Sequence, residues 1–277
     1  MPFPDRMTRR RLGMFFGAGL TGVALGLARD DDKEPADGQF ESFARGAKRY
    51  KLILETQPPR PLTLVNEPIL KWTNPLRKTN DGEVFVWVAD GRPEVVASFY
   101  RYQLEGEAVE EHEFQSLATV RLSGLRDGRV VWLPPKEGVT LQPVPGATVP
   151  ADSPAGRLRQ MRALAREFKA FFDLPKNTSE LRLLTNPLYR YTPTRPDLVD
   201  GALFAFVETT DPEVILMLEA RRPQAGAAPA WHYAVARSSM VNLRAEHQGR
   251  DIWRVGWVID VAAPGKPYLT IAAPTTH

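Results

Sequence analysis

Residues 81–103 read DGEVFVWVADGRPEVVASFYRYQ, and residues 200–222 read DGALFAFVETTDPEVILMLEARR. Seven of the 23 aligned positions are identical without a gap, where chance would give about one or two. Similarity of this kind between two segments of one chain is the signature of a repeated architecture. The two segments therefore predict an internal duplication.

Matching landmarks flank the two segments in the same order. Thr73-Asn74-Pro75 aligns with Thr185-Asn186-Pro187, and this alignment requires a seven-residue insertion after the second of them. Each Asn-Pro pair favours a turn, because the residue before a proline avoids the helical region. On the other side of the segments, five residues align with five others: Val120, Leu122, Gly128, Arg129 and Trp132 with Val241, Leu243, Gly249, Arg250 and Trp253.

Both copies have the residue pattern of antiparallel β-strands. Stretches rich in β-branched and aromatic residues at 83–89 and 94–102 flank Asp90-Gly91, which is a hairpin signal. The second copy has the matching stretches 202–208 and 213–221. A third and a fourth strand of each copy are expected at 112–122, 128–133, 232–243 and 250–259.

A helix is expected before each copy. In the second copy Asp152 or Ser153 can cap the helix, and Pro154 suits its first turn. Its apolar residues recur at helical spacing: Leu158, Met161, Leu164, Ala165, Phe168 and Phe172. The helix before the first copy has a shorter apolar stripe: Phe40, Phe43, Ala44, Ala47 and Tyr50.

These elements predict an α+β fold of two related antiparallel-sheet units, each preceded by one helix, after an N-terminal export signal. The units can share one continuous sheet or pack about a pseudo-twofold axis, and the sequence leaves both arrangements open. The expected boundaries are 1–28 for the signal, 29–38 for a charged linker, 39–133 for the first repeat, 134–152 for a Pro-rich link and 153–277 for the second repeat.

The first 28 residues have the order of charges and apolar residues found in an export signal. Arg9 and Arg10 resemble the paired arginines of a twin-arginine signal, and an apolar run with several glycines follows over residues 12–28. This run is short for a membrane span, which needs about 20 strongly apolar residues. Cleavage is expected after Ala28, which predicts a mature protein in the periplasm or cell envelope. The alternatives are an uncleaved N-terminal anchor, which would be the protein's one contact with the membrane, and a buried core helix.

The composition excludes several classes of function. The chain has no cysteine, which excludes disulfides, thiolate metal sites and cysteine nucleophiles. Its formal net charge is +3, and residues 1–28 account for all of it with four arginines and one aspartate. The remainder is formally neutral, so we expect no nucleic-acid partner.

Few residues point to chemistry. The sequence contains no Gly-rich phosphate loop, Gly-x-Ser-x-Gly elbow or His-Glu-x-x-His motif, and we expect no cofactor. The densest group of possible metal ligands is Glu110-Glu111-His112-Glu113. Strand alternation sends His112 and Glu113 to opposite faces, and the repeat alignment places His232 opposite Glu111. His112, Glu113 and His232 are therefore the candidate metal or acid–base residues; the alternative is a strand end with solvated charges.

The chain resembles a family of exported bacterial proteins of unknown function. The resemblance rests on LKWTNP, DGEVFVW with its continuation GRPEVVAS, AGRLRQMRALAREF and DGALFAFVETTDPEVILMLEAR, and it covers most of residues 50–255. It implies export and a single folded unit, and it implies no activity, ligand or catalytic residue.

Two functional hypotheses follow from the sequence. The first is an exported cell-envelope protein that acts as a non-enzymatic binding or structural module, with an envelope protein or a small ligand as its partner. The second is an exported hydrolase or metal-dependent enzyme with its site between the two repeats. A polar cleft between the repeats would favour the enzyme, whereas an exposed apolar patch and a closed junction would favour the module.

Overall fold

A computed structural model describes residues 42–174, 177–192, 194–224 and 226–273. The predicted export signal, with Arg9, Arg10 and Ala28, lies outside the described residues, and so does the predicted charged linker. No helix in the described ranges is long and apolar enough to cross a lipid bilayer.

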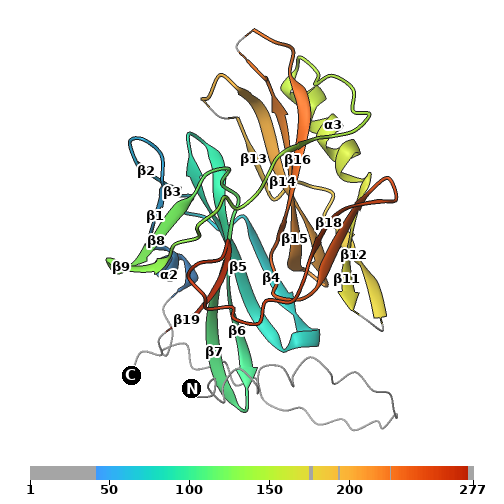
Figure 1. The fold of residues 1–277 in the computed structure, drawn as a ribbon. Helices are drawn as coiled ribbons and strands as arrows, with labels where there is room; N and C mark the ends of the chain where they lie inside the picture. Colours follow the sequence, from blue (N-terminus) through green and yellow to red (C-terminus); the bar gives the residue numbers. More distant parts are fainter. Residues whose placement is uncertain (1–41, 175–176, 193, 225, 274–277) are drawn as a thin grey trace. The chain divides into compact units, whose positions relative to one another are not determined.

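The two aligned segments form two long β-hairpins (Figure 1). The first consists of β5 (Thr79–Ala89) and β6 (Arg92–Leu104), and the second of β14 (Leu198–Glu208) and β15 (Asp211–Arg221). Asp90 and Gly91 turn the first hairpin with φ angles of 50° and 81°, as expected for the Asp-Gly signal. Thr209 turns the second hairpin with a φ of 53°.

The strands of the described residues, including these two hairpins, form three sheets. The first half of the described chain, residues 42–133, adds α2 (Phe43–Lys48), β1 (Tyr50–Leu54), β2 (Arg60–Pro61), β3 (Thr63–Leu64), β4 (Leu70–Asn74), the 3₁₀ turn η2 (Pro75–Arg77), β7 (Glu107–Ser116), β8 (Leu122–Arg126) and β9 (Arg129–Trp132). After β10 (Gln142–Pro143), the second half, residues 154–258, adds α3 (Pro154–Ala165), β11 (Phe168–Leu174), β12 (Asn177–Leu183), β13 (Tyr189–Tyr191), β16 (Ala230–Arg237), β17 (Leu243–His247) and β18 (Arg250–Val255). The chain then returns to the first half, where β19 (Tyr268–Ala272) pairs with β7.

Strand pairing follows the same scheme in both halves. The pairs β1–β8, β8–β9, β3–β5, β4–β5, β5–β6 and β6–β7 recur as β11–β17, β17–β18, β12–β14, β13–β14, β14–β15 and β15–β16. In the second half β12 pairs with both β11 and β14, which makes one continuous curled sheet. In the first half the equivalent stretch is divided into β2 and β3, so the strands form two sheets with the orders β2-β1-β8-β9 and β19-β7-β6-β5-β3.

The predicted alignment of the two Thr-Asn-Pro sequences is wrong. Leu70 pairs with Val84, and Tyr189 pairs with Leu203, which places β13 at a constant distance of 119 residues after β4. Residues 185–187 precede β13 and therefore correspond to residues 66–68, which precede β4. With this correction the halves correspond through their first hairpins without the seven-residue insertion.

The predicted α+β class is also wrong, because 53% of the described residues lie in strands and 9% in helices. The helix expected to continue to Phe172 ends at Ala165, and Phe168 and Phe172 lie on β11. A spacing of four residues fits one face of a helix and also one face of a strand, so this pair alone could not distinguish the two structures. The burial of the side chains alternates as in a strand: Phe168, Ala170 and Phe172 are buried, whereas Lys169 is exposed. The expected cap is confirmed, since the Ser153 hydroxyl accepts the N–H of Gly156 at 3.1 Å.

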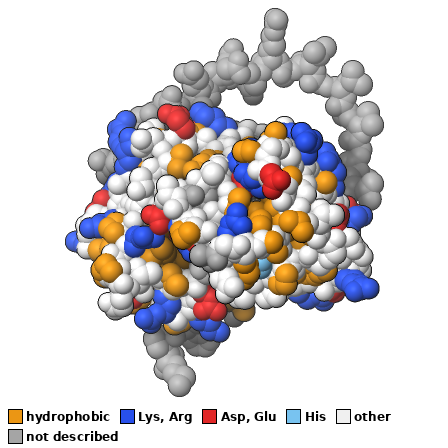
Figure 2. All heavy atoms as spheres, turned by 90° about the horizontal axis from the view of Figure 1, so that it is seen from above, with side chains coloured by type: hydrophobic (Ala, Val, Ile, Leu, Met, Phe, Trp, Pro, Cys, Tyr) orange, Lys and Arg blue, Asp and Glu red, His pale blue; other side chains and the backbone are white. Residues whose placement is uncertain are grey.

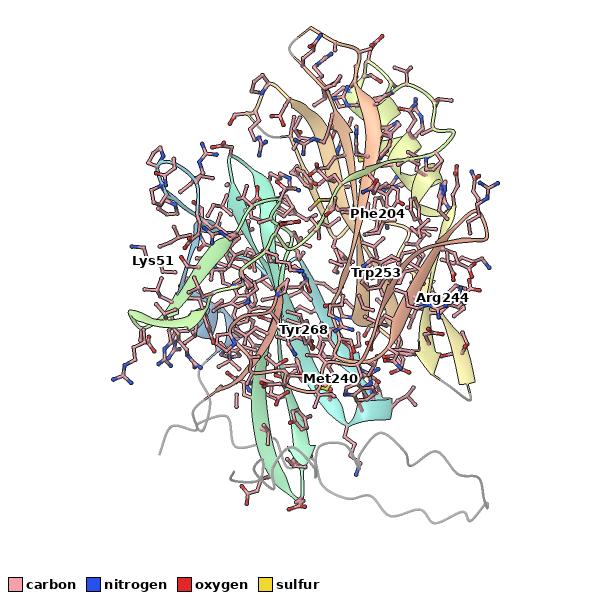
Figure 3. All side chains as sticks on the ribbon, in the orientation of Figure 1. Lys51, Phe204, Met240, Arg244, Trp253 and Tyr268 are labelled. Carbon is pink, nitrogen blue, oxygen red and sulfur yellow. The ribbon has the colours of Figure 1, made fainter. Side chains whose placement is uncertain are left out.

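Strand alternation divides the apolar residues among three cores. One lies inside the first half and includes Phe85, Phe99 and Phe114. Another lies inside the second half and includes Phe204, labelled in Figure 3, with Trp253 packed against it. The third joins the outer faces of the two long hairpins and includes Val84, Val86, Leu203, Ala205, Ile215 and Met217. We call this third core and the polar groups around it the junction.

Candidate functional site

The three residues singled out from the sequence lie at different places. His112 faces the first-half core, where its ring lies 3.9 Å from that of Phe99 between centroids. Glu113 lies on the opposite face of β7 and contacts Tyr268. His232 lies on β16 opposite Glu219, and its Nδ1 is 3.1 Å from the carbonyl oxygen of Ala230. Among the described residues, no group of three or more His, Asp or Glu side chains is placed to hold a metal ion.

His112 belongs to a buried chain of hydrogen bonds. Its Nδ1 is 2.8 Å from the Tyr50 hydroxyl, and its Nε2 is 2.9 Å from Glu110. Glu110 also accepts the Nε–H of Arg101 at 2.8 Å. A neutral imidazole satisfies both contacts when Tyr50 donates to Nδ1 and Nε2–H donates to Glu110. We call this chain the Tyr50 relay.

The order of groups in the Tyr50 relay resembles that of a nucleophile activated by a histidine and an acid. Burial, however, raises the pKa of Tyr50, so its hydroxyl stays protonated. The shallow recess beside it is apolar and has no room for a water molecule, and its other lining residues are Leu52, Phe114, Val131, Trp132, Leu269 and Ile271. The relay therefore satisfies buried polar groups and presents no activated oxygen to a polar substrate.

A first cluster of buried charges lies in the junction around Arg92. The guanidinium of Arg92 contacts Glu94 of its own strand at 2.6 Å and Glu219 of the second half at 2.8 Å. Glu219 also accepts the Tyr191 hydroxyl at 2.8 Å and is paired with Arg221 at 2.8 Å. The Arg92 side chain is only 1% exposed and that of Glu219 is 0% exposed. Arg221 is also paired with Asp197, which has Arg195 as a further partner, so three arginines balance three carboxyl groups in this cluster.

A second cluster of buried charges lies around Arg77 of η2, next to the turn between β14 and β15. Arg77 is paired with Glu208 at 3.0 Å, with Asp211 at 3.6 Å and with Glu213 at 2.7 Å. The side-chain amide of Asn74 donates to Glu208 at 3.2 Å and to Asp211 at 3.0 Å. One guanidinium therefore faces three carboxyl groups, and we call this set, together with Glu113 and Tyr268, the acidic cluster.

The excess of carboxyl groups changes their proton affinity. Burial raises the pKa of Glu113 to about 8; the charges of Glu213 and Glu111 add to this effect, while the Tyr268 hydrogen bond and Arg77 oppose it. Burial and the charge of Glu213 raise the pKa of Asp211 well above its ordinary value. Burial also raises the pKa of Glu213, against the opposing effect of Arg77. At neutral pH the cluster therefore holds at least one proton on a carboxyl group.

The two clusters are built from equivalent strand positions with different residues. Glu94 and Glu213 are equivalent, and both come after a proline in PEV sequences. The residue of the second half that is equivalent to Arg92 is Asp211. β15 therefore supplies no arginine to Glu213 at this position, and Glu213 pairs instead with Arg77 of the first half. The change of one arginine to an aspartate accounts for the acidic excess.

Sequence reasoning missed most of the acidic cluster: Asn74, Arg77, Glu208, Asp211, Glu213 and Tyr268. One signal was present, because a glutamate interrupts the same apolar strand in both copies. A charged residue in a strand buried on both faces needs a partner, so the PEV glutamates could have been chosen as site residues. In searches against known proteins, no protein-family model, no curated protein and no solved structure matches this chain.

Proposed function

We propose that this protein is an exported cell-envelope protein that acts as a non-enzymatic binding or structural module. The observation that carries the proposal is the burial of Arg92, whose guanidinium joins Glu94 of the first half to Glu219 of the second. A buried charge of this kind needs partners, and both partners lie inside the protein. This chemistry stabilises the junction of the halves and is closed to a substrate.

Two further observations support the proposal. The arginine pair Arg9-Arg10 and the following apolar run support export. The formally neutral remainder of the chain supports a partner other than a nucleic acid. On the face shown in Figure 2, positive and negative side chains are interspersed with apolar ones, which fits a protein or small-molecule partner.

An exported hydrolase is the second candidate, because one observation favours it. Glu113 has a pKa raised to about 8 by burial, and a carboxyl group that keeps its proton near neutral pH is what general acid catalysis requires. The Glu113 residue is 9% exposed, so a substrate could reach it only after the junction opens.

A thermal-shift screen of the chain from Arg29, the expected mature form, tests the function. The ligands are envelope sugars and short peptides, with divalent metal ions and a chelator as further arms. A ligand at 100 times its Kd adds about 2.7 kcal/mol, which corresponds to a shift of roughly 5–10 °C for a protein of this size. We expect a shift with a sugar or a peptide that remains in the Glu113→Gln variant, with no product formed on long incubation. Turnover of a ligand that disappears in Glu113→Gln would instead support the hydrolase.

Export has its own test, which separates it from binding. Replacement of Arg9 and Arg10 by lysine should keep the full chain in the cytoplasm, as shown by cell fractionation with a cytoplasmic marker. Normal export of this variant would contradict the twin-arginine assignment and leave the binding result untouched.

A further inference from the structure

The outer face of the sheet β2-β1-β8-β9 carries two adjacent apolar residues. Leu125 of β8 pairs with Lys51 of β1 on one side and with Val130 of β9 on the other, so the three side chains form one row on the same face of the sheet. Tyr50 and Leu52, the neighbours of Lys51, belong to the first-half core. The row therefore points away from that core, as Figure 3 shows for Lys51, and Val130 is 63% exposed.

The second half has charged residues at the equivalent positions. Glu246 of β17 pairs with Asp251 of β18 as Leu125 pairs with Val130. Both carboxylates are paired with Arg244, labelled in Figure 3, and Asp251 lies 2.8 Å from it. The same kind of sheet thus accepts a charged outer face in this protein. The exposed apolar pair of the first half is therefore not a requirement of the fold, and such residues on a surface mark a site of interaction.

The elements around the apolar pair have an excess of positive charge. Residues 42–55 and 121–133, which include α2, β1, β8 and β9, contain seven basic and two acidic residues, a net charge of +5. The equivalent residues of the second half, 160–173 and 242–254, contain six basic and four acidic residues. Because the chain after residue 28 is formally neutral, the positive excess is a local property of the first half.

The two acidic residues in these elements already have arginine partners. Asp127 is paired with Arg49 at 2.5 Å. Glu55 lies 3.9 Å from Arg121. The charge of the exposed Lys48 and of Lys51 is thus left over for a partner outside the protein. We call the outer side of β1, β8 and β9, with Leu125, Val130 and these two lysines, the basic face.

The residue types of the basic face favour a lipid surface over a protein. Protein partners are held chiefly by aromatic residues and arginines inserted into pockets. The apolar pair here is aliphatic and lies on a sheet, with lysine side chains beside it. Aliphatic residues at the depth of the lipid headgroups, with basic residues around them, hold a protein on an anionic membrane. Each basic residue near such a surface strengthens binding by about fivefold.

We propose that the basic face docks on an anionic lipid bilayer, with Leu125 and Val130 among the headgroups and with Lys48 and Lys51 against the phosphates. The proposal goes beyond the proposed function, because it concerns a face outside the junction and does not depend on export. Its failure would leave the response to sugars and peptides in the thermal-shift screen unaffected.

Co-sedimentation with lipid vesicles tests the proposal. The protein is the chain from Arg29, the expected mature form, because the apolar run of residues 12–28 would itself bind lipid. One set of vesicles contains phosphatidylcholine alone, and the other also contains the anionic lipid phosphatidylglycerol. We expect binding to the anionic vesicles only, and we expect added salt to weaken it because salt screens exposed charges. Absence of binding, or equal binding to both sets of vesicles, would overturn the proposal.

Two double variants test whether the charge acts at this face. Lys48→Gln with Lys51→Gln should weaken binding to the anionic vesicles by about tenfold or more. Arg166→Gln with Lys169→Gln removes the same charge from the equivalent, exposed positions of the second half and should bind as the wild-type protein does. Equal losses in the two variants would show that overall charge and not the basic face causes binding, and would refute the proposal.

A single variant tests the apolar pair. Val130→Asp introduces the residue that the second half has at the equivalent position, Asp251. It should weaken binding to the anionic vesicles by about fivefold or more and leave the melting temperature nearly unchanged, because Val130 is 63% exposed. Undiminished binding of this variant would contradict contact between the apolar pair and the bilayer.

Discussion

Glu94 and Glu213 occupy equivalent positions in the two halves, but their cations come from different places. Glu94 is paired at 2.6 Å with Arg92, two residues before it on β6. Glu213 is paired at 2.7 Å with Arg77, which belongs to the other half. One half of the chain thus neutralises its own buried glutamate, whereas the other half depends on a contact across the junction.

Removal of Arg92 should destabilise the protein strongly. Arg92→Met leaves Glu94 and Glu219 buried without their shared cation, and loss of one partner of a buried ion pair costs about 3–5 kcal/mol. Urea unfolding measures this loss. As a control, Lys169→Met removes an exposed ion pair with Glu180 and should cost under about 1 kcal/mol. Similar costs for the two variants would show that the Arg92 cluster does not hold the halves together.

The free energy of unfolding should fall as the pH rises from about 4.5 to 8. Glu113, with its folded-state pKa raised to about 8 by burial, binds a proton in the folded state that the unfolded state has lost in this range. Glu113→Gln should therefore lose roughly 3–5 kcal/mol less stability than the wild-type protein over this interval. Part of the slope should remain, because the pKa values of Asp211 and Glu213 are also raised. Urea unfolding at several pH values checks this, and parallel curves for the two proteins would refute it.

Two glycines should be intolerant of a side chain for the same reason. A Cβ atom at Gly82 would lie 2.2 Å from the Trp72 ring, and one at Gly201 would lie 2.4 Å from the Tyr191 ring. Each aromatic residue pairs with its glycine across β4–β5 or β13–β14. Gly82→Ala and Gly201→Ala should each lower the unfolding free energy by about 1–3 kcal/mol.

The matched control for the glycine variants is Gly256, where an added Cβ would meet nothing within 4 Å. Gly256→Ala should change the melting temperature little. Melting temperatures of all three variants, measured together, decide the matter. A loss at Gly256 as large as that at Gly82 would mean that backbone freedom, and not contact with the aromatic ring, sets the cost.

The Tyr50 relay should contribute to stability and not to function. Tyr50→Phe removes the hydroxyl that lies 2.8 Å from His112 Nδ1 and leaves a buried nitrogen without that partner, at a cost of about 1–3 kcal/mol. Binding of any ligand found in the thermal-shift screen should keep its Kd. Loss of turnover of a ligand in Tyr50→Phe, with the fold intact by circular dichroism, would assign the relay a catalytic role.

The local sequence determined the two long hairpins and their equivalence in the two halves of the chain. The β-branched and aromatic residues of 83–89 and the Asp90-Gly91 turn depend only on neighbouring residues, so β5 and β6 could be predicted, although β5 begins four residues earlier than expected and β6 extends two residues further at each end. The capping of α3 by Ser153 could be predicted for the same reason. The predicted helix is wrong at Phe168 and Phe172. A spacing of four residues fits one face of a helix and one face of a strand, and only packing against the second-half core selects the strand.

The sequence by itself determined the repeated strand pattern, the separation of His112 from Glu113 onto opposite faces, and the presence of a glutamate inside an apolar strand of each copy. Only the tertiary structure decided which cations meet those glutamates. Arg77 and Glu213 are 136 residues apart, and Tyr268 and Glu113 are 155 residues apart. Local periodicity carries no information about such pairs, because they meet only when β19 returns to the first half and the two long hairpins pack face to face. Burial then fixes which carboxyl groups keep their protons, and that property belongs to the folded junction alone.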